Sequence, residues 1–428
     1  MRKPFHLKLK QAYIPLLIYC VFLTGFFGST LAYPRLSYLF LYRIFLGFLF
    51  VVICIDMILN GIEIKRFLNF SSYFLIGWSA YSLLSFLWVQ DIKSALRDQI
   101  FLTVNILVIL IFMYYSNYIK WGVLENIIMF SYAVNIIVGY WEVITDRHLW
   151  TSKVPIYNLH RTPSTFFANP NDFATYLVLY LPFIFNFVVR EKSLNIKKIV
   201  ALAITLLSVP LLILTTSRAN YIGFVLVLIV YFLLIDNSEK REYLKYVFFI
   251  FLFLMVLIGF RLDFGFLNRI SELITTQLSS LFDFSTSSLT SNVRRELLIV
   301  YGLSFLYDYL FLGVGAGNSR ILMEKVKQYT INVELHNWFL DVLVSYGVIV
   351  FVLYIIWILY IIYKLLKLKN TNNRLKLLAI SIVSSLAAFG ISSISSSKMI
   401  EMRIMWFLFA LALFIISSSQ EVKGEPES

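Results

Sequence analysis

Three arginines stand out in a very apolar sequence as residues that could carry chemistry. Arg294 and Arg295 are adjacent and open the apolar stretch 297–311. The dipole of a helix disfavours positive charge at its start, so this pair needs another reason. Guanidinium groups bind phosphate oxygens through paired hydrogen bonds, and two of them together could clamp a diphosphate. Anchoring of the chain to lipid phosphates is the alternative explanation.

The third arginine, Arg218, lies in the sequence LILTTSRANYIGF between two apolar segments. An arginine at a membrane edge often does no more than reach from the lipid into water. The hydroxyl residues Thr215, Thr216 and Ser217 stand next to it, and such a polar cluster also suits an anion-binding site. The residues alone leave both interpretations open.

His336 begins the sequence HNWFLDVLVSYG at the mouth of an apolar segment, and Glu334 precedes it by two residues. Histidine side chains exchange protons near neutral pH, so His336 could act as a general base oriented by Glu334. It could also simply cap a helix. His148 and His160 lie elsewhere, at spacings that match no zinc motif, and we therefore expect no metal site.

Three glycines follow the arginine pair, at Gly313, Gly315 and Gly317. The run resembles a nucleotide-binding loop only superficially, because no strand precedes it. It predicts a tight turn that ends the preceding helix.

The composition predicts a polytopic membrane protein. The chain has 428 residues, of which 60% are hydrophobic, whereas soluble proteins have about 45–50%. Its apolar runs are continuous rather than alternating, which favours helices over a β-barrel. We expect an all-α integral membrane protein with about twelve spans, near 12–30, 38–59, 71–88, 100–116, 122–140, 172–189, 199–215, 219–235, 246–260, 337–363, 377–397 and 404–418.

The charge distribution predicts the topology. The net charge is +13, and most lysines lie in short loops that the positive-inside rule assigns to the cytoplasm, together with both termini. No soluble basic domain remains to bind nucleic acid. The predicted divisions are spans one to nine in 1–260, an extracytoplasmic loop with interfacial helices in 261–336, three spans in 337–418 and a cytoplasmic tail in 419–428.

Four segments together resemble the O-antigen ligase and polymerase family of bacterial polysaccharide assembly. They read FFANPNDFATYLVLYLP, LTTSRANYIGF, SNVRRELLIVYGLSFLYDYLFLGVGAGNSR and LHNWFLDVLVSYGVIVFVLYI, in the order and with the spacing that the family shows. The resemblance implies about twelve spans with a large external loop before the last three. It also implies a metal-independent glycosyltransferase without a cofactor, whose sugar donors are linked to undecaprenyl diphosphate. One departure is that the family often has proline before the glycine turn, where this chain has Leu312.

The resemblance also suggests the roles of single residues. The family's TSR arginine falls on Arg218, its loop arginine on Arg295 with Arg294 as the neighbouring alternative, and its HN histidine on His336. The arginines would bind the diphosphate and stabilise the charge that develops on it as it leaves. His336 would remove the proton of the attacking sugar hydroxyl, and direct displacement would invert the anomeric configuration. The residues expected to contact substrate are Asn169, Asn171, Asp172, Arg97 and Asn337.

These residues predict a polysaccharide repeat-unit polymerase at the outer face of the bacterial cytoplasmic membrane. It would transfer glycan from an undecaprenyl-diphosphate-linked donor to a sugar hydroxyl of a lipid-linked acceptor, building capsule, exopolysaccharide, O-antigen or a teichuronic-acid-like chain. The alternatives are a ligase that moves finished glycan to a terminal acceptor, or a transporter or flippase. Richness in Ile, Lys, Asn and Phe is typical of AT-rich genomes, which are commoner in single-membrane bacteria. Such bacteria have no lipid A to accept a finished glycan, so the composition favours the polymerase. A chain-length regulator, a flippase and membrane lipid are the expected partners.

Overall fold

The computed structural model describes residues 9–33, 39–157, 159–190, 193, 195–259, 286–326, 334–370, 373–394 and 399–421. These residues fold almost entirely into helices, with one isolated antiparallel bridge between Ala32 and Phe40. Lipid offers no hydrogen-bond partners to a backbone, whereas a helix satisfies its own peptide groups within one segment. The predicted all-helical class is therefore confirmed for the described part of the chain.

Nine helices in the described part are long and apolar enough to cross a membrane. Two further apolar helices, α9 (Arg218–Leu234) and α16 (Arg403–Glu421), are shorter, and α10 (Asn237–Gly259) is apolar over its second half. Each expected span overlaps one of these helices. The nine are Leu9–Leu31, which contains α2 (Ile14–Phe27) and η2 (Gly28–Leu31), then α3 (Leu41–Asn60), α4 (Phe70–Leu84) continued by η5 (Ser85–Leu87), α5 (Ile92–Tyr114), α6 (Trp121–Thr145), α7 (Pro170–Arg190), α8 (Ile196–Leu214), α14 (Trp338–Leu366) and α15 (Asn373–Ser392).

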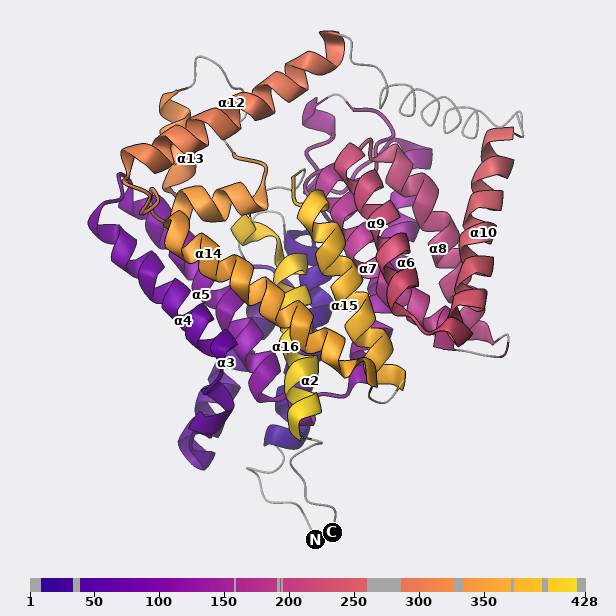
Figure 1. Ribbon diagram of the computed structural model, residues 1–428, viewed down its shortest axis with the longest axis horizontal. Helices are drawn as coiled ribbons and strands as arrows, with labels where there is room; N and C mark the ends of the chain where they lie inside the picture. Colours follow the sequence, from indigo (N-terminus) through magenta and orange to yellow (C-terminus); the bar gives the residue numbers. More distant parts are fainter. Residues whose placement is uncertain are drawn as a thin grey trace.

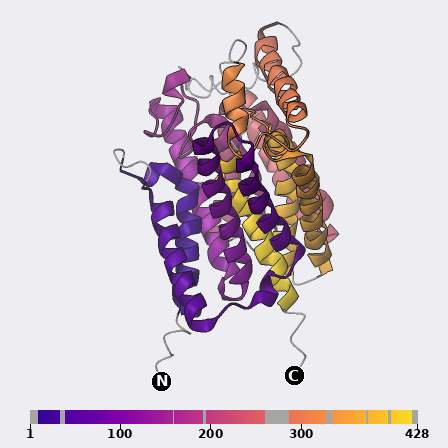
Figure 2. The same ribbon diagram turned by 90° about the vertical axis from the view of Figure 1, so that its left-hand side faces the viewer.

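The spanning helices lie side by side in one bundle (Figures 1 and 2). The start of α2 and the end of α16 lie at the same end of this bundle. At the opposite end, α12 (Thr286–Asp308) and α13 (Asn318–Lys325) pack against α14. We call this opposite end the loop end, and α3, α5, α7, α9, α14 and α16 all begin there.

Helix α7 forms the centre of the bundle. In its most apolar window 94% of the residues are buried, and it packs against α8, α9 and α15. Aromatic side chains fill the space around it: the ring of Tyr180 lies 5.0 Å from that of Phe26, and its hydroxyl donates to the carbonyl of Ile404 at 2.7 Å. Helix α3 is the opposite case, with only 28% of its window buried, and it lies at the edge of the bundle.

Buried charge fixes the helices at the end opposite the loop end. Glu125 of α6 is buried, and its carboxylate binds Arg190 of α7 at 3.2 Å and Arg374 of α15 at 2.6 Å. Burying a carboxylate is costly unless cations and hydrogen bonds offset it. Here the two guanidiniums offset the cost of burying Glu125, and they fix the positions of α6, α7 and α15 relative to one another along the bundle.

The glycine run packs against a break in α14. Gly347 has φ 79° and ψ 175°, which ends the regular hydrogen bonding of that helix. The run supplies the missing partners: Val314 donates to the carbonyl of Val344 at 2.9 Å, and Val348 donates to that of Phe311 at 3.0 Å. The predicted turn at the end of α12 is therefore confirmed, and it also closes the kink in α14.

Two predicted positions are wrong. The expected spans 71–88 and 100–116 leave Lys93 and Arg97 in the loop between them, but α5 begins at Ile92, so both lie in its first turns. Arg294 and Arg295 were expected at a helix start, but α12 begins at Thr286 and they lie in its middle. In both cases the helix extends beyond the apolar run, because a helix outside lipid does not need apolar side chains.

We expect Gly347→Ala to destabilise the protein by about 2–3 kcal/mol, since its backbone conformation is essentially restricted to glycine. A Cβ at this position would also lie 2.4 Å from the carbonyl oxygen of Leu312. Thermal unfolding of the purified protein in detergent measures the loss. The control is Gly390→Ala in α15, where a Cβ meets nothing within 4 Å. Equal stability of the two variants would contradict the role of the kink.

Candidate functional site

Arg218 begins α9 at the loop end, and its side chain is exposed. The residues beside it are held firmly: Ser217 and Asn220 are buried, and the Asn220 amide donates to Ser217 Oγ at 2.9 Å. The same amide donates to the carbonyl of Asn171 at 3.4 Å. The TSRAN sequence is therefore fixed against the start of α7, while the Arg218 side chain extends outward.

The start of α7 carries the predicted residues Asn169, Asn171 and Asp172. Asn169 accepts a hydrogen bond from the backbone N–H of Asp172 and donates to its carboxylate, both at 2.9 Å. This exchange satisfies amide groups that a helix start leaves open. Asn171 and Asp172 thus have defined positions next to α9.

The segment that precedes α7 is anchored on Glu142, a residue that the sequence analysis missed. Glu142 is fully buried near the end of α6, and its carboxylate accepts from the backbone N–H groups of Ser164 at 2.7 Å and Thr165 at 2.8 Å. The Nδ1 atom of His148 lies 3.4 Å from the same carboxylate. A carboxylate in the last turn of a helix opposes the helix dipole, and this was the available signal that it has partners.

A second contact closes the same segment. Asp146 ends α6 with φ 55° and accepts from the backbone N–H of Arg161 at 2.5 Å, and His160 Nδ1 lies 3.0 Å from its carboxylate. The Arg161 N–H, with a smaller contribution from His160, holds the pKa of Asp146 below its ordinary value. His148 and His160 thus each contact a different carboxylate. Among the described residues, no group of three or more His, Cys, Asp or Glu could hold a metal ion.

His336 and Asn337 lie just before α14, also at the loop end. His336 has φ 47°, a left-handed conformation that is uncommon for residues other than glycine. Asn337 caps the helix by accepting from the backbone N–H of Leu340 at 3.2 Å. Glu334 faces α13, with its carboxylate 3.9 Å from the Arg320 guanidinium.

The end of α15 brings these helix starts together. The backbone N–H of Trp338 donates to the carbonyl of Ser393 at 3.3 Å. On α9, a Cβ added to Gly223 would lie 2.3 Å from Ser392 Oγ, so the two helices are in close contact there. The starts of α9 and α14 therefore flank one helix end, with the start of α7 beside α9. The side chains of Arg294 and Arg295 lie outside the described part of the structure.

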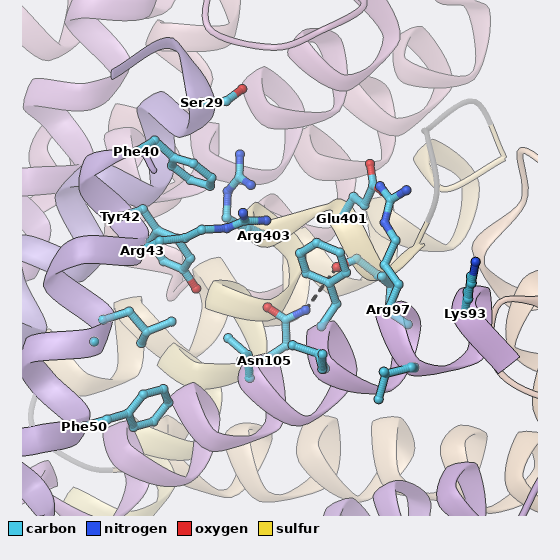
Figure 3. Close-up of a pocket in the computed structure, with 17 residues that line it drawn as sticks. Ser29, Phe40, Tyr42, Arg43, Phe50, Lys93, Arg97, Asn105, Glu401 and Arg403 are labelled. Carbon is cyan, nitrogen blue, oxygen red and sulfur yellow. Dashed lines mark hydrogen bonds and ion pairs between the residues drawn. The ribbon is translucent and has the colours of Figure 1, made fainter. Parts of the chain in front are cut away.

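A pocket of about 980 Å³ lies between η2, α3, α5, η9 (Met399–Glu401) and α16, and it contains the predicted residue Arg97 (Figure 3). The Arg97 guanidinium binds the Glu401 carboxylate at 2.9 Å. Two further arginines line the pocket: Arg43 and Arg403 lie 4.9 and 5.3 Å from the ring centroid of Phe40. The sequence analysis missed Arg43, Arg403 and Glu401. A signal was available, because the positive-inside rule does not explain the positive charges of Lys93 and Arg97 at the loop end.

Arg403 connects this pocket to the start of α7. Its Nε donates to the carbonyl of Gly25 at 3.4 Å, and a Cβ on Gly28, which has φ 54°, would lie 2.3 Å from its Nη2. The negative charge of Asp172 acts on this guanidinium.

These features define a multi-pass membrane protein whose polar residues gather at one end of a helical bundle. The family model described as O-antigen ligase matches residues 203–355, which include Arg218, Arg294, Arg295 and His336. The chain is also 30% identical over 359 residues to the teichuronic acid biosynthesis protein TuaE of Bacillus subtilis (strain 168), a match that covers 80% of this chain and 70% of TuaE. The chain belongs to the O-antigen ligase and polymerase family.

We expect Glu142→Gln to loosen the segment between α6 and α7. Hydrogen bonds to a charged group contribute about 1.5–3 kcal/mol each, and the neutral amide would weaken two of them. Limited trypsin digestion should then cut faster at Lys153 and Arg161, within this segment. Glu63→Gln is the control, because Glu63 is exposed and its carboxylate pairs with Arg66. Equal cleavage rates in the two variants would contradict the anchoring role of Glu142.

Proposed function

We propose that the protein is a polymerase that joins lipid-linked saccharide repeat units into a bacterial surface polysaccharide. The observation that carries the proposal is the gathering of three helix starts around the end of α15: Ser217–Arg218 of α9, Asn171–Asp172 of α7 and His336–Asn337 before α14. These are the positions on which the family resemblance predicts the reactive residues. Membership of the family supports the assignment to glycosyl transfer.

In the proposed reaction the acceptor hydroxyl oxygen attacks the anomeric carbon of the donor glycan. The new C–O bond forms as the bond from that carbon to the diphosphate breaks, and the diphosphate leaves with the electron pair. Arg218 and Arg295 stabilise the charge on the leaving diphosphate, with Arg294 as the neighbouring alternative. His336 accepts the hydroxyl proton. Displacement from the opposite face inverts the anomeric configuration, and residues of this chain supply every charge that the step needs.

The strained backbone of His336 supports its role. A non-glycine residue with positive φ costs about 1 kcal/mol or more and persists where the surroundings impose it. Here the next two residues are fixed on both sides, by the Asn337 cap and by the Trp338 bond to Ser393. This fixes the backbone of His336 at the mouth of α14. Asn337, Asn169, Asn171, Asp172 and Arg97 would contact the saccharide or its carrier.

The proposed topology has twelve spans, both termini in the cytoplasm and the site on the outer face of the cytoplasmic membrane. Residues 1–260 form the first nine spans, 261–336 the large outer loop, 337–418 the last three spans and 419–428 the tail. Two observations support this orientation. The start of α2 and the end of α16 share one end of the bundle, and that end carries Arg190 and Arg374. The positive-inside rule assigns such an end to the cytoplasm.

Two outcomes remain for the glycan. The similarity to TuaE, a teichuronic acid biosynthesis protein, favours a polymerase that extends a polysaccharide. The family description, O-antigen ligase, favours transfer of a finished glycan to a terminal acceptor. The donor in both cases is undecaprenyl-diphosphate-linked glycan, and a flippase and a chain-length regulator would be partners.

We expect Arg218→Ala, expressed in a strain lacking the chromosomal gene, to reduce chain growth about 100-fold or more, because a fixed charge on the leaving group is lost. Gel analysis of the surface glycan measures chain length, and blotting measures the protein in the membrane. Arg147→Ala removes an exposed arginine at the same end and should have no effect. Single repeat units in the deletion strain indicate a polymerase, whereas polymer retained on the lipid carrier indicates a ligase. Normal-length polymer with Arg218→Ala would exclude its role.

We expect His336→Ala to slow glycosyl transfer about 100-fold without weakening donor binding, since a general base acts in the transition state. Single-turnover rates and donor affinity, measured on protein in nanodiscs, separate the two effects. His160→Ala serves as the control, because His160 is exposed and lies in the segment between α6 and α7. An unchanged rate with His336→Ala would remove it as the base.

A further inference from the structure

The pocket that contains Arg43, Arg97 and Arg403 lies outside the segment 203–355 that the family model matches. Its lining includes four cationic side chains, these three arginines and Lys93, against the single carboxylate of Glu401, which gives a net charge of +3. Asp172, which acts on Arg403, is the further carboxylate nearby. Three helices supply these cations, α3, α5 and α16, so only the tertiary fold brings them together (Figure 3).

The arginines are close enough to repel one another. Arg43 and Arg403 share the ring of Phe40, the charge of Arg97 acts on Arg43, and the charge of Arg43 acts on Arg403. Cation–π contacts with Phe40 and Phe101 help to hold the guanidiniums of Arg43, Arg97 and Arg403 in place. Clustered like charges of this kind favour a multivalent anion with several oxygens. A diphosphate meets this requirement, because it offers bidentate partners to more than one guanidinium.

The remaining walls of the pocket are apolar, and they face the edge of the bundle. Leu96 and Ile100 line the pocket and yet are 52% and 55% exposed, so one side of it opens where lipid would lie. Gly47 on α3 also lines it, and a Cβ there would meet nothing within 4 Å. A soluble phosphate compound would gain nothing from these walls. A long hydrocarbon attached to the diphosphate would gain by covering them.

We infer that this pocket binds the diphosphate head of a polyprenyl carrier, with the first isoprene units between α3 and α5. The inference rests on the proposed polymerase function and assigns the pocket to the carrier of the acceptor. The donor's diphosphate belongs at Arg218, so a reaction between two lipid-linked substrates requires a second diphosphate site. The charge of Asp172, in the first turn of α7, acts on Arg403, and Asn171 in the same turn contacts Asn220 beside Arg218. The acceptor glycan then extends across the first turn of α7 towards the donor.

The test measures binding of undecaprenyl diphosphate to the full-length protein in nanodiscs. The wild type should bind two molecules per chain, and Arg43→Gln and Arg403→Gln should each lower the affinity of one site about tenfold or more, as expected for losing a charge-assisted hydrogen bond. Gly47→Leu should block the same site sterically without changing any charge. The matched controls are Arg147→Gln, an exposed arginine at the loop end, and Gly77→Leu in α4, where a Cβ likewise meets nothing within 4 Å. Both controls should retain two sites.

Several outcomes would overturn the inference. Two intact sites in Gly47→Leu and in the arginine variants would show that the carrier does not occupy this pocket. Equal competition by phosphatidylglycerol would identify a general site for anionic phospholipid instead. Loss of folding in Arg403→Gln, detected by its melting temperature, would leave Gly47→Leu and Arg43→Gln to decide the question.

Kinetics separate this inference from the proposed function. With a lipid-linked acceptor, Gly47→Leu should raise the KM for acceptor about tenfold and leave the KM for donor unchanged. With a free oligosaccharide acceptor, which has no diphosphate, the variant should match the wild type. A wild-type protein that binds two carrier molecules but never extends a glycan would refute the polymerase function and support the carrier site in the pocket. A wild-type protein that extends chains but has only one carrier site would refute the carrier site in the pocket and leave the polymerase function standing.

Discussion

The arrangement of polar groups at the loop end depends on the burial of α7. This helix is surrounded by its neighbours along nearly its whole length, so it cannot shift without opening the core. Its first turn consequently has one position, closed by the exchange between Asn169 and Asp172. Two neighbouring helices are hydrogen-bonded to α7: Asn220 of α9 donates to the carbonyl of Asn171, and Tyr180 of α7 donates to the carbonyl of Ile404 in α16. One buried helix therefore sets the places of cations that come from different parts of the chain.

A second constraint comes from the break in α14. A broken helix leaves carbonyl and N–H groups without partners, which is costly at the edge of a membrane. The glycine run supplies those partners, because Gly313 and Gly347 allow two backbones to touch. The same turn accepts a hydrogen bond from Trp88 at the Gly313 carbonyl, at 2.9 Å. The turn thus joins α12 to α14 and to the connection that leads into α5, which carries Arg97.

The spans could be predicted from the sequence because lipid requires a continuous apolar run, and each expected span overlaps a helix. The helix starts at the loop end lie within three residues of the expected ones, except that of α5, because polar turns continue this helix beyond the lipid. Arg97 is the example, since α5 begins at Ile92 rather than near residue 100. The proposed roles of Arg218 and His336 come from short local patterns in the family motifs, and they stay predictions. The pocket has no such pattern: Arg43 and Arg403 are 360 residues apart, and only the tertiary fold brings them onto one ring, through the packing of α2 against both α3 and α16.

The two cationic centres differ in their surroundings, and the difference suits different tasks. Arg218 is exposed, whereas Arg43 and Arg403 are partly buried against Phe40. Two unit charges 4 Å apart attract by about 1 kcal/mol in water and about 4 kcal/mol near a protein surface of lower dielectric. In the proposed reaction the diphosphate leaves in every cycle, and an exposed arginine would bind it weakly enough to allow this. A carrier that stays bound while its glycan is being joined needs the stronger attraction, which the aromatic and apolar walls of the pocket provide.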